Sequence, residues 1–168
     1  MRGRTIRFPD APGLRPTPDR VRETLFNWLG QELTGRRCLD LYAGTGALSL
    51  EAASRGAALC VAVDSNRTLI DALRATAARL DAPALETHVA DARTYLGREA
   101  RDFDVVFLDP PFREDPWPWL LSACAARVAP HGFVYAEAPS PLAPPAGLLP
   151  WRRDKAGQVH YHLFTKPG

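Results

Sequence analysis

The sequence predicts an α/β fold in which a mostly parallel sheet is covered by helices on both faces. From residue 36 onward, apolar runs alternate with amphipathic ones, which is typical of repeated strand–helix units. Two of these runs, 58–64 and 104–109, are apolar at nearly every position, as strands buried on both faces are. A length of 168 residues suits one well-buried domain over residues 1–168.

The elements of this core, residues 36–168, follow one another in a regular order. Strands are expected at 38–43, 58–64, 84–91, 104–109 and 132–138. Helices are expected at 46–55, 66–80 and 117–127. The proline-rich segment 139–150 can form neither a long helix nor a central strand. The tail should form an antiparallel hairpin around Ala156 and Gly157 that closes the edge of the sheet.

A helix over residues 17–29 is expected before the core. Thr17 is a good N-cap and Pro18 suits the first helical position. One apolar stripe, which should pack on the core, is formed by Val21, Leu25, Trp28 and Leu29.

A basic arm, residues 1–16, precedes this helix. Residues 1–37 contain eight arginines and four acidic residues, a net charge of +4, whereas the remaining 13 basic and 15 acidic residues give −2. This asymmetry favours a contact with nucleic-acid phosphates, although a solvated tail is the alternative. The candidate nucleic-acid-binding residues are Arg2, Arg4, Arg7, Arg15, Arg20 and Arg22.

Composition excludes several classes of protein. No run approaches the roughly 20 apolar residues that a membrane helix requires. The basic N-terminus lacks the apolar segment of a secretory signal, so a cytoplasmic protein is expected. Cys38, Cys60 and Cys124 form no CxxC pair and are not expected to be disulfide partners or zinc ligands. Cys38 and Cys60 lie in predicted strands and are expected to be small buried residues. The four histidines are interpreted as surface or strand residues.

The predicted first strand leads into a glycine-rich turn. Gly44 and Gly46 allow the chain to turn sharply and allow a ligand to approach the backbone. Asp64 ends the second strand, where nucleotide-binding α/β enzymes place a carboxylate that binds ribose, although it could also cap a helix. Asp91 ends the third strand and could accept from an adenine amino group while the Ala92 amide faces a ring nitrogen.

This pattern suits a ligand with a ribose, an adenine and a cationic sulfonium better than one with a pyrophosphate. A dinucleotide fingerprint would have a third glycine where Ser49 stands, and no lysine precedes Lys155. We therefore expect S-adenosylmethionine as the cofactor and S-adenosylhomocysteine as the product. The candidate cofactor-binding residues here are Asp40, Tyr42, Ala43, Gly44, Thr45, Gly46, Asp64, Ser65, Asp91 and Ala92.

The sharpest motif is Asp109-Pro110-Pro111-Phe112 at the end of the fourth predicted strand. An exocyclic amino group of a nucleobase is a poor nucleophile because its lone pair is delocalised into the ring. The Asp109 carboxylate and the Pro110 carbonyl can accept its two hydrogens and so expose the lone pair, while the prolines hold that carbonyl rigidly. Phe112 would stack on the extruded base. No metal is needed, and a proline turn is the purely structural alternative.

With these motifs, the chain resembles the RsmD-type bacterial 16S ribosomal RNA guanine-N2 methyltransferases. The matching segments are LRPTPDRVRETLFNWL (14–29), DLYAGTGALSLEAASRGA (40–57), FDVVFLDPPF (103–112) and AGQVHYHLF (156–164). The resemblance implies a class I, Rossmann-like methyltransferase fold with a seven-stranded sheet whose last strand is antiparallel. It also implies cofactor binding by Gly44–Gly46, Asp64 and Asp91-Ala92, and catalysis by Asp109 to Phe112.

The same resemblance implies a guanine of small-subunit rRNA as the target, within a partly assembled particle. It places Thr17 near the cofactor and the basic arm on RNA. Family members usually have an extra strand before the RGR segment, whereas here Met1 almost adjoins it; this departure bears on RNA affinity more than on chemistry. We expect a monomer that does not bind membranes.

Three other functions compete with this interpretation. A DNA adenine-N6 or cytosine-N4 methyltransferase also uses Asp-Pro-Pro-aromatic, but usually carries an added recognition domain for which 168 residues leave no room. A non-catalytic ribosome-assembly factor could keep the fold alone, although the intact motif at Asp109 argues against it. A nicotinamide oxidoreductase is disfavoured by Ser49.

Overall fold

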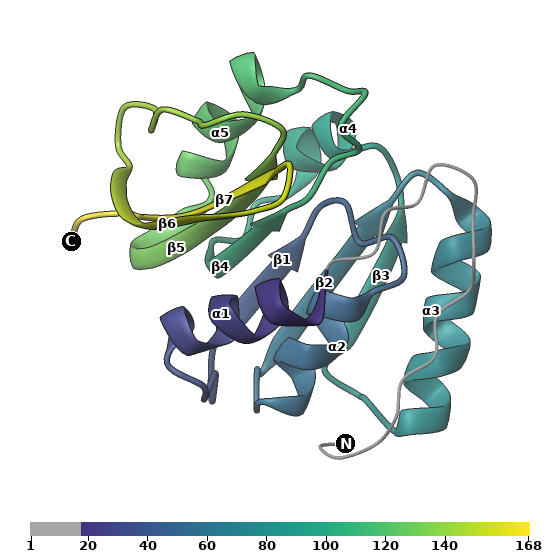
Figure 1. The fold of residues 1–168 in the computed structure, drawn as a ribbon. Helices are drawn as coiled ribbons and strands as arrows, with labels where there is room; N and C mark the ends of the chain where they lie inside the picture. The colour runs from purple at the N-terminus through teal and green to yellow at the C-terminus, as the bar shows by residue number, and fades with distance from the viewer. Residues whose placement is uncertain (1–17) are drawn as a thin grey trace.

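The computed structural model describes residues 18–168, which form one seven-stranded sheet in the order β3-β2-β1-β4-β5-β7-β6 (Figure 1). The first five strands run parallel, and β7 pairs antiparallel with both β5 and β6. The mostly parallel sheet with an antiparallel last strand is therefore confirmed. The strands are β1 (Arg37–Asp40), β2 (Leu59–Asp64), β3 (Leu85–Val89), β4 (Phe103–Leu108), β5 (Val128–Ala138), β6 (Leu149–Ala156) and β7 (Val159–Thr165).

Helices cover both faces of the sheet, as expected. The helices are α1 (Asp19–Leu29), α2 (Ala47–Ser54), α3 (Arg67–Leu80), α4 (Ala92–Arg98) and α5 (Trp117–Ala125). Side chains of α1 and α2 pack on one face around Phe107 and Tyr135, and α3 covers the same face beside β2. Helices α4 and α5 pack on the other face around Val106 and Val134. No helix among residues 18–168 is long and apolar enough to cross a membrane.

The apolar stripe of α1 packs on the core as predicted. Val21, Leu25 and Leu29 are buried, and Trp28 stacks on Tyr161 of β7 with ring centroids 5.3 Å apart. The start of this helix differs from the expectation, because Pro18 is the N-cap and not the first helical residue. Thr17, the predicted N-cap, lies outside the described residues.

Several element boundaries differ from the predicted ones. The first strand ends at Asp40 instead of residue 43, because the backbone already turns toward Gly44. The third ends at Val89, and the fifth begins at Val128, four residues earlier than expected, with a bulge opposite β4. Strand β6 begins at Leu149, within the predicted connector, which a sheet edge permits despite Pro150.

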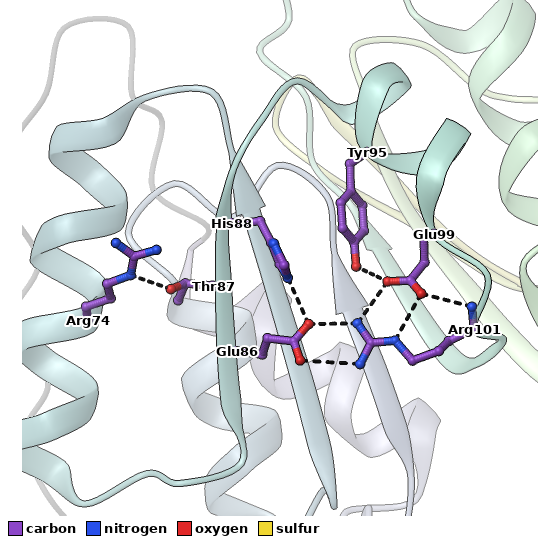
Figure 2. Close-up of polar contacts among 7 residues, drawn as sticks. All are labelled: Arg74, Glu86, Thr87, His88, Tyr95, Glu99 and Arg101. Carbon is purple, nitrogen blue, oxygen red and sulfur yellow. Dashed lines mark hydrogen bonds and ion pairs between the residues drawn. The ribbon is translucent and has the colours of Figure 1, made fainter.

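Helix α4 was not predicted at all. Asp91 caps it by accepting hydrogen bonds from the Thr94 amide (2.9 Å) and hydroxyl (2.7 Å). An ionic network then fixes its last turn to the edge strand β3 (Figure 2). Arg101 contacts Glu86 (2.7 Å) and Glu99 (2.9 Å), and Glu99 also accepts from Tyr95. The network therefore holds in place the helix that begins at Asp91.

All three cysteines are free and buried, as expected for Cys38 and Cys60. Cys38 and Cys60 are paired neighbours in the parallel strands β1 and β2. Of the histidines, His88, His160 and His162 lie in strands and His131 is exposed on β5, which agrees with the prediction.

Candidate functional site

A crevice of about 560 Å³ opens at the carboxyl ends of β1, β2 and β4, where parallel α/β sheets bind ligands. It gathers most of the predicted site residues. Its walls include Asp40, Tyr42, Ala43, Gly44, Thr45, Asp64, Ser65, Asp91, Ala92, Asp109, Pro110 and Pro111. Its volume lies within the range of small-molecule sites.

Among residues 18–168, two of the predicted cofactor-binding and catalytic residues do not contribute to the wall. Gly46 is the N-cap of α2 at a φ of +83°, and a β-carbon there would lie 2.3 Å from a terminal carbon of Leu73 on α3. The absence of a side chain at Gly46 therefore lets α2 pack closely against α3, and this packing fixes the position of the turn. Phe112 is half-buried next to the crevice wall but is not one of its lining residues.

The Asp64 carboxylate orders the glycine turn. One of its oxygens accepts from the Gly44 amide (2.9 Å), and the other accepts from the Asn66 amide (2.8 Å). Asn66, not Asp64, caps α3 by accepting from the Leu69 amide. Because each carboxylate oxygen has two lone pairs, Asp64 can still accept hydrogen bonds from a ligand.

Asp40 is a buried carboxyl group beneath the glycine turn, with 3% of its surface exposed. Ser49 donates a 2.8 Å hydrogen bond to it. Burial raises the pKa of Asp40 to about 7, the negative charge of Asp64 adds to the rise, and the Ser49 hydrogen bond opposes it. A cationic ligand in the crevice would favour the ionised form, so Asp40 and Asp64 fit a sulfonium or ammonium group.

The opposite wall of the crevice is formed by the segment that follows β4. Asp109 is half-buried and Pro110 is buried, while Trp119 of α5 closes this side with the Arg93 guanidinium 5.1 Å from its ring centroid. Sequence reasoning missed Trp119 and Arg93, because their proximity depends on the packing of α4 against α5. The wall thus offers rigid oxygen acceptors together with an aromatic surface.

Two further residues, which were not predicted from the sequence, lie beside Asp109. Leu108, the last residue of β4, pairs with Ala136, so Asp109 lies next to Glu137, which is still within β5. Glu137 is fully buried and accepts a 2.8 Å hydrogen bond from Tyr135. Burial raises the pKa of Tyr135 well above 10, and the negative charges of Glu137 and Asp109 add to the rise. Tyr135 therefore stays protonated and available as a donor.

The predicted RNA-binding arginines are only partly described. Arg20 is exposed on α1, whereas Arg22 is half-buried and forms a 2.6 Å ion pair with Asp19. Arg22 is thus less available to a polyanion than expected. The other candidates, Arg2, Arg4, Arg7 and Arg15, lie outside the described residues.

Comparison with known proteins decides the family. The family described as conserved hypothetical protein 95 matches residues 1–165. The chain is 37% identical over 170 residues to ribosomal RNA small subunit methyltransferase D of Escherichia coli K12, covering 98% of this chain and 86% of that protein. It is 33% identical to the protein of the same name from Haemophilus influenzae, covering 97% and 89%.

The chain belongs to the RsmD family. This confirms the resemblance inferred from the sequence and, with it, the methyltransferase class of the enzyme. The solved structure of the Escherichia coli protein yhhF superposes with a TM-score of 0.88 at 36% identity, covering 99% of this chain and 93% of that one. Magnesium protoporphyrin IX methyltransferase from Synechocystis, solved with bound S-adenosylmethionine, has a TM-score of 0.71 at 16% identity over 88% of this chain and 78% of its own, which shows a shared fold. This RsmD-family chain therefore has the class I methyltransferase fold.

Proposed function

We propose that this chain transfers a methyl group from S-adenosylmethionine to the exocyclic N2 amino group of a guanine in 16S rRNA. The observation that carries the proposal is the convergence of two sets of groups on one crevice: the carboxylates Asp40 and Asp64, and the acceptor segment Asp109-Pro110. The first set suits a cationic nucleoside, and the second suits an amino group. The names of the Escherichia coli and Haemophilus influenzae relatives support small-subunit rRNA as the substrate.

The cofactor would lie along the turn between β1 and α2. Gly44 and Thr45 offer backbone close to the ligand, and Asp64 would accept from the ribose hydroxyls. At the adenine end, the Ala92 amide lies at the first position of α4, where an amide has no acceptor within its own helix. Asp91 caps that helix with both oxygens and would contact the adenine amino group through a remaining lone pair. Asp40 would face the cationic end.

The residues of the β4 end would activate and hold the amino group. The Asp109 carboxylate and the Pro110 carbonyl would accept its two hydrogens, which frees the nitrogen lone pair. S-adenosylmethionine supplies an electrophilic methyl group and a neutral thioether leaving group. As the N–C bond forms and the S–C bond breaks, the nitrogen loses one proton to Asp109 or to water. Phe112 would stack on the extruded base from beside the crevice wall.

RNA would approach across the edge of the sheet at which the crevice opens. Arg20 is the described candidate that is exposed for phosphate contact, together with the basic arm, residues 1–16. An assembling small subunit is the proposed partner, which the names of the small-subunit methyltransferase relatives support.

The decisive experiment supplies labelled S-adenosylmethionine together with unmethylated small subunits, naked 16S rRNA or DNA. Mapping the labelled base should show N2-methylguanine in rRNA alone. Methyladenine or methylcytosine in DNA would assign the chain to the DNA amino-methyltransferases. Binding of small subunits with no transfer to any substrate would identify a non-catalytic assembly factor.

A further inference from the structure

A second cavity lies away from the crevice and shares none of its lining residues. Its volume is about 680 Å³, and it lies between the proline-rich connector that follows β5 and the edge strand β6. Pro141 and Leu142 form one side, and Trp151 and Arg153 form the other. We refer to this cavity as the β6 groove.

The rim of the β6 groove combines an exposed aromatic ring with cations. Trp151 is 49% exposed, and it and Leu149 are the exposed large hydrophobic residues of the described chain. The Arg152 guanidinium lies 5.0 Å from the centroid of the Trp151 ring. Arg152, Arg153 and Lys155 against Asp154 give β6 a net charge of +2, and all four residues are exposed.

The floor of the groove is preformed. His162 and Phe164 of β7 line it, and their rings stack at 5.7 Å with planes 8° apart. His162 Nε2 accepts a 3.1 Å hydrogen bond from the Leu142 amide, so Nδ1 carries the proton and donates to the Ala136 carbonyl. The connector is thereby held to the sheet, and a ligand would enter a fixed groove at little ordering cost.

We propose that the β6 groove binds a single-stranded segment of the RNA substrate, remote from the methylated base. A base would stack on Trp151, and the adjacent phosphates would contact Arg152 and Arg153. Positive charge interleaved with an exposed indole matches a flexible polyanion with stacking faces. This inference rests on the proposed function, because it names how that substrate is held.

The strand direction makes this placement useful. Because β6 and β5 both pair antiparallel with β7, β6 runs in the same direction as β5 and ends at the same edge of the sheet. That edge contains the crevice opening at β1 and β4. An RNA segment lying along β6 would therefore lead toward the crevice and its wall at Asp109.

The test uses the full chain and three variants of the rim. Trp151→Ala should weaken binding of a labelled single-stranded oligoribonucleotide by about tenfold, because it removes the ring on which a base would stack. Trp151→Phe should retain most of the wild-type affinity, because it keeps an aromatic ring for stacking. The double variant Arg152→Glu and Arg153→Glu should reduce the slope of log Kd against log salt by about 1.4, because each neutralised phosphate of a single strand contributes about 0.7.

Methyl transfer to unmethylated small subunits supplies the second readout. The rim variants should raise KM for the particle while leaving kcat and the Kd for S-adenosylmethionine unchanged. Arg79→Glu, at an exposed arginine in the last turn of α3, is the control for a charge reversal away from the groove and should behave like the wild type.

Two outcomes would overturn the inference. If the rim variants bound the oligoribonucleotide with wild-type affinity and salt slope, the groove would not be an RNA-binding site. Variants that lose the assembled particle but keep naked rRNA would assign the groove to a ribosomal protein. Failure of the wild type to methylate any RNA would instead contradict the proposed function, because oligoribonucleotide binding is measured without transfer.

Discussion

Tyr135 donates a 2.8 Å hydrogen bond to Glu137, and both side chains are fully buried next to the strand end that leads to Asp109. The pKa of Tyr135 is raised first by burial and then by the charges of these two carboxylates, so the phenol remains a donor. The pair thus lies beneath the crevice wall that Asp109 helps to form, as a polar contact among buried apolar side chains. A buried carboxylate that loses a donor suffers a desolvation penalty.

Tyr135→Phe should therefore lower the free energy of unfolding by about 1–3 kcal/mol, although it removes one oxygen atom only. Urea unfolding monitored by circular dichroism measures the change. An unaltered midpoint and slope would show that Glu137 gains nothing from this donor.

Asp109→Ala should lower kcat by about 10²–10³-fold, the usual effect of losing one transition-state acceptor, with the Kd for S-adenosylmethionine nearly intact. Single-turnover methyl transfer and calorimetric titration separate the two effects. Undiminished turnover would exclude Asp109 from the mechanism.

Gly46→Ala should destabilise the chain by about 2–4 kcal/mol, because a positive φ costs about 1–2 kcal/mol and overpacking against Leu73 adds to it. Gly97→Ala is the matched control: Gly97 lies in α4, and a β-carbon there meets nothing within 4 Å. The control should be neutral or stabilise the chain by up to about 1 kcal/mol. Equal unfolding midpoints for the two variants would contradict the packing role of Gly46.

The affinity of the chain for S-adenosylmethionine should increase as the pH is raised through about 7. The pKa of Asp40 is raised to about 7 mainly by burial, and a cationic ligand prefers the ionised carboxylate. Above this pKa, Asp40 is already ionised, so binding need not release its proton. Titration of S-adenosylmethionine at several pH values should show this rise in the wild type and a flatter profile in Asp40→Asn. The same profile in both proteins would assign the pH dependence elsewhere.

The ionic network of Figure 2 should stabilise the chain at neutral pH and fail in acid. Hydrogen bonds from Arg101 hold the pKa of Glu99 at about 2, below its ordinary 4.5. A depressed carboxyl pKa contributes stability that is present above 4.5 and is lost as the pH falls toward 2. Arg101→Ala should cost about 1–3 kcal/mol at pH 7 and much less at about pH 3. A cost that did not change between these pH values would contradict this assignment.

Sequence reasoning found the fold because its signals are local. Apolar runs such as 104–109 and the stripe at Val21 and Leu25 depend only on near neighbours, and each lies in its predicted element. The short helix α4 was missed because its buried face has only Ala92, Tyr95 and Leu96 amid polar residues, too few to give a periodic pattern.

The parts of the site that come from a single chain segment were predicted from the sequence. The parts that depend on two segments packing together were missed. The turn at Gly44 and the residue Asp109 each follow one strand, so their place at the carboxyl ends of the strands follows from topology. The proximity of Glu137 to Asp109 depends on the register of β4 with β5, which contains a bulge. The proximity of Trp119 to Arg93 likewise depends on two helices that no spacing rule connects.

The adjacent thiols of Cys38 and Cys60, paired across β1 and β2, have one practical consequence. The neighbouring Cys60 and burial raise the pKa of Cys38 far above that of a free thiol, so little Cys38 thiolate exists in the folded chain. Since Cys124 is buried as well, alkylating reagents can reach these sulfurs only when the sheet or its helical cover opens. The rate at which these cysteines are alkylated, followed by mass spectrometry, therefore reports the rate at which the folded chain opens.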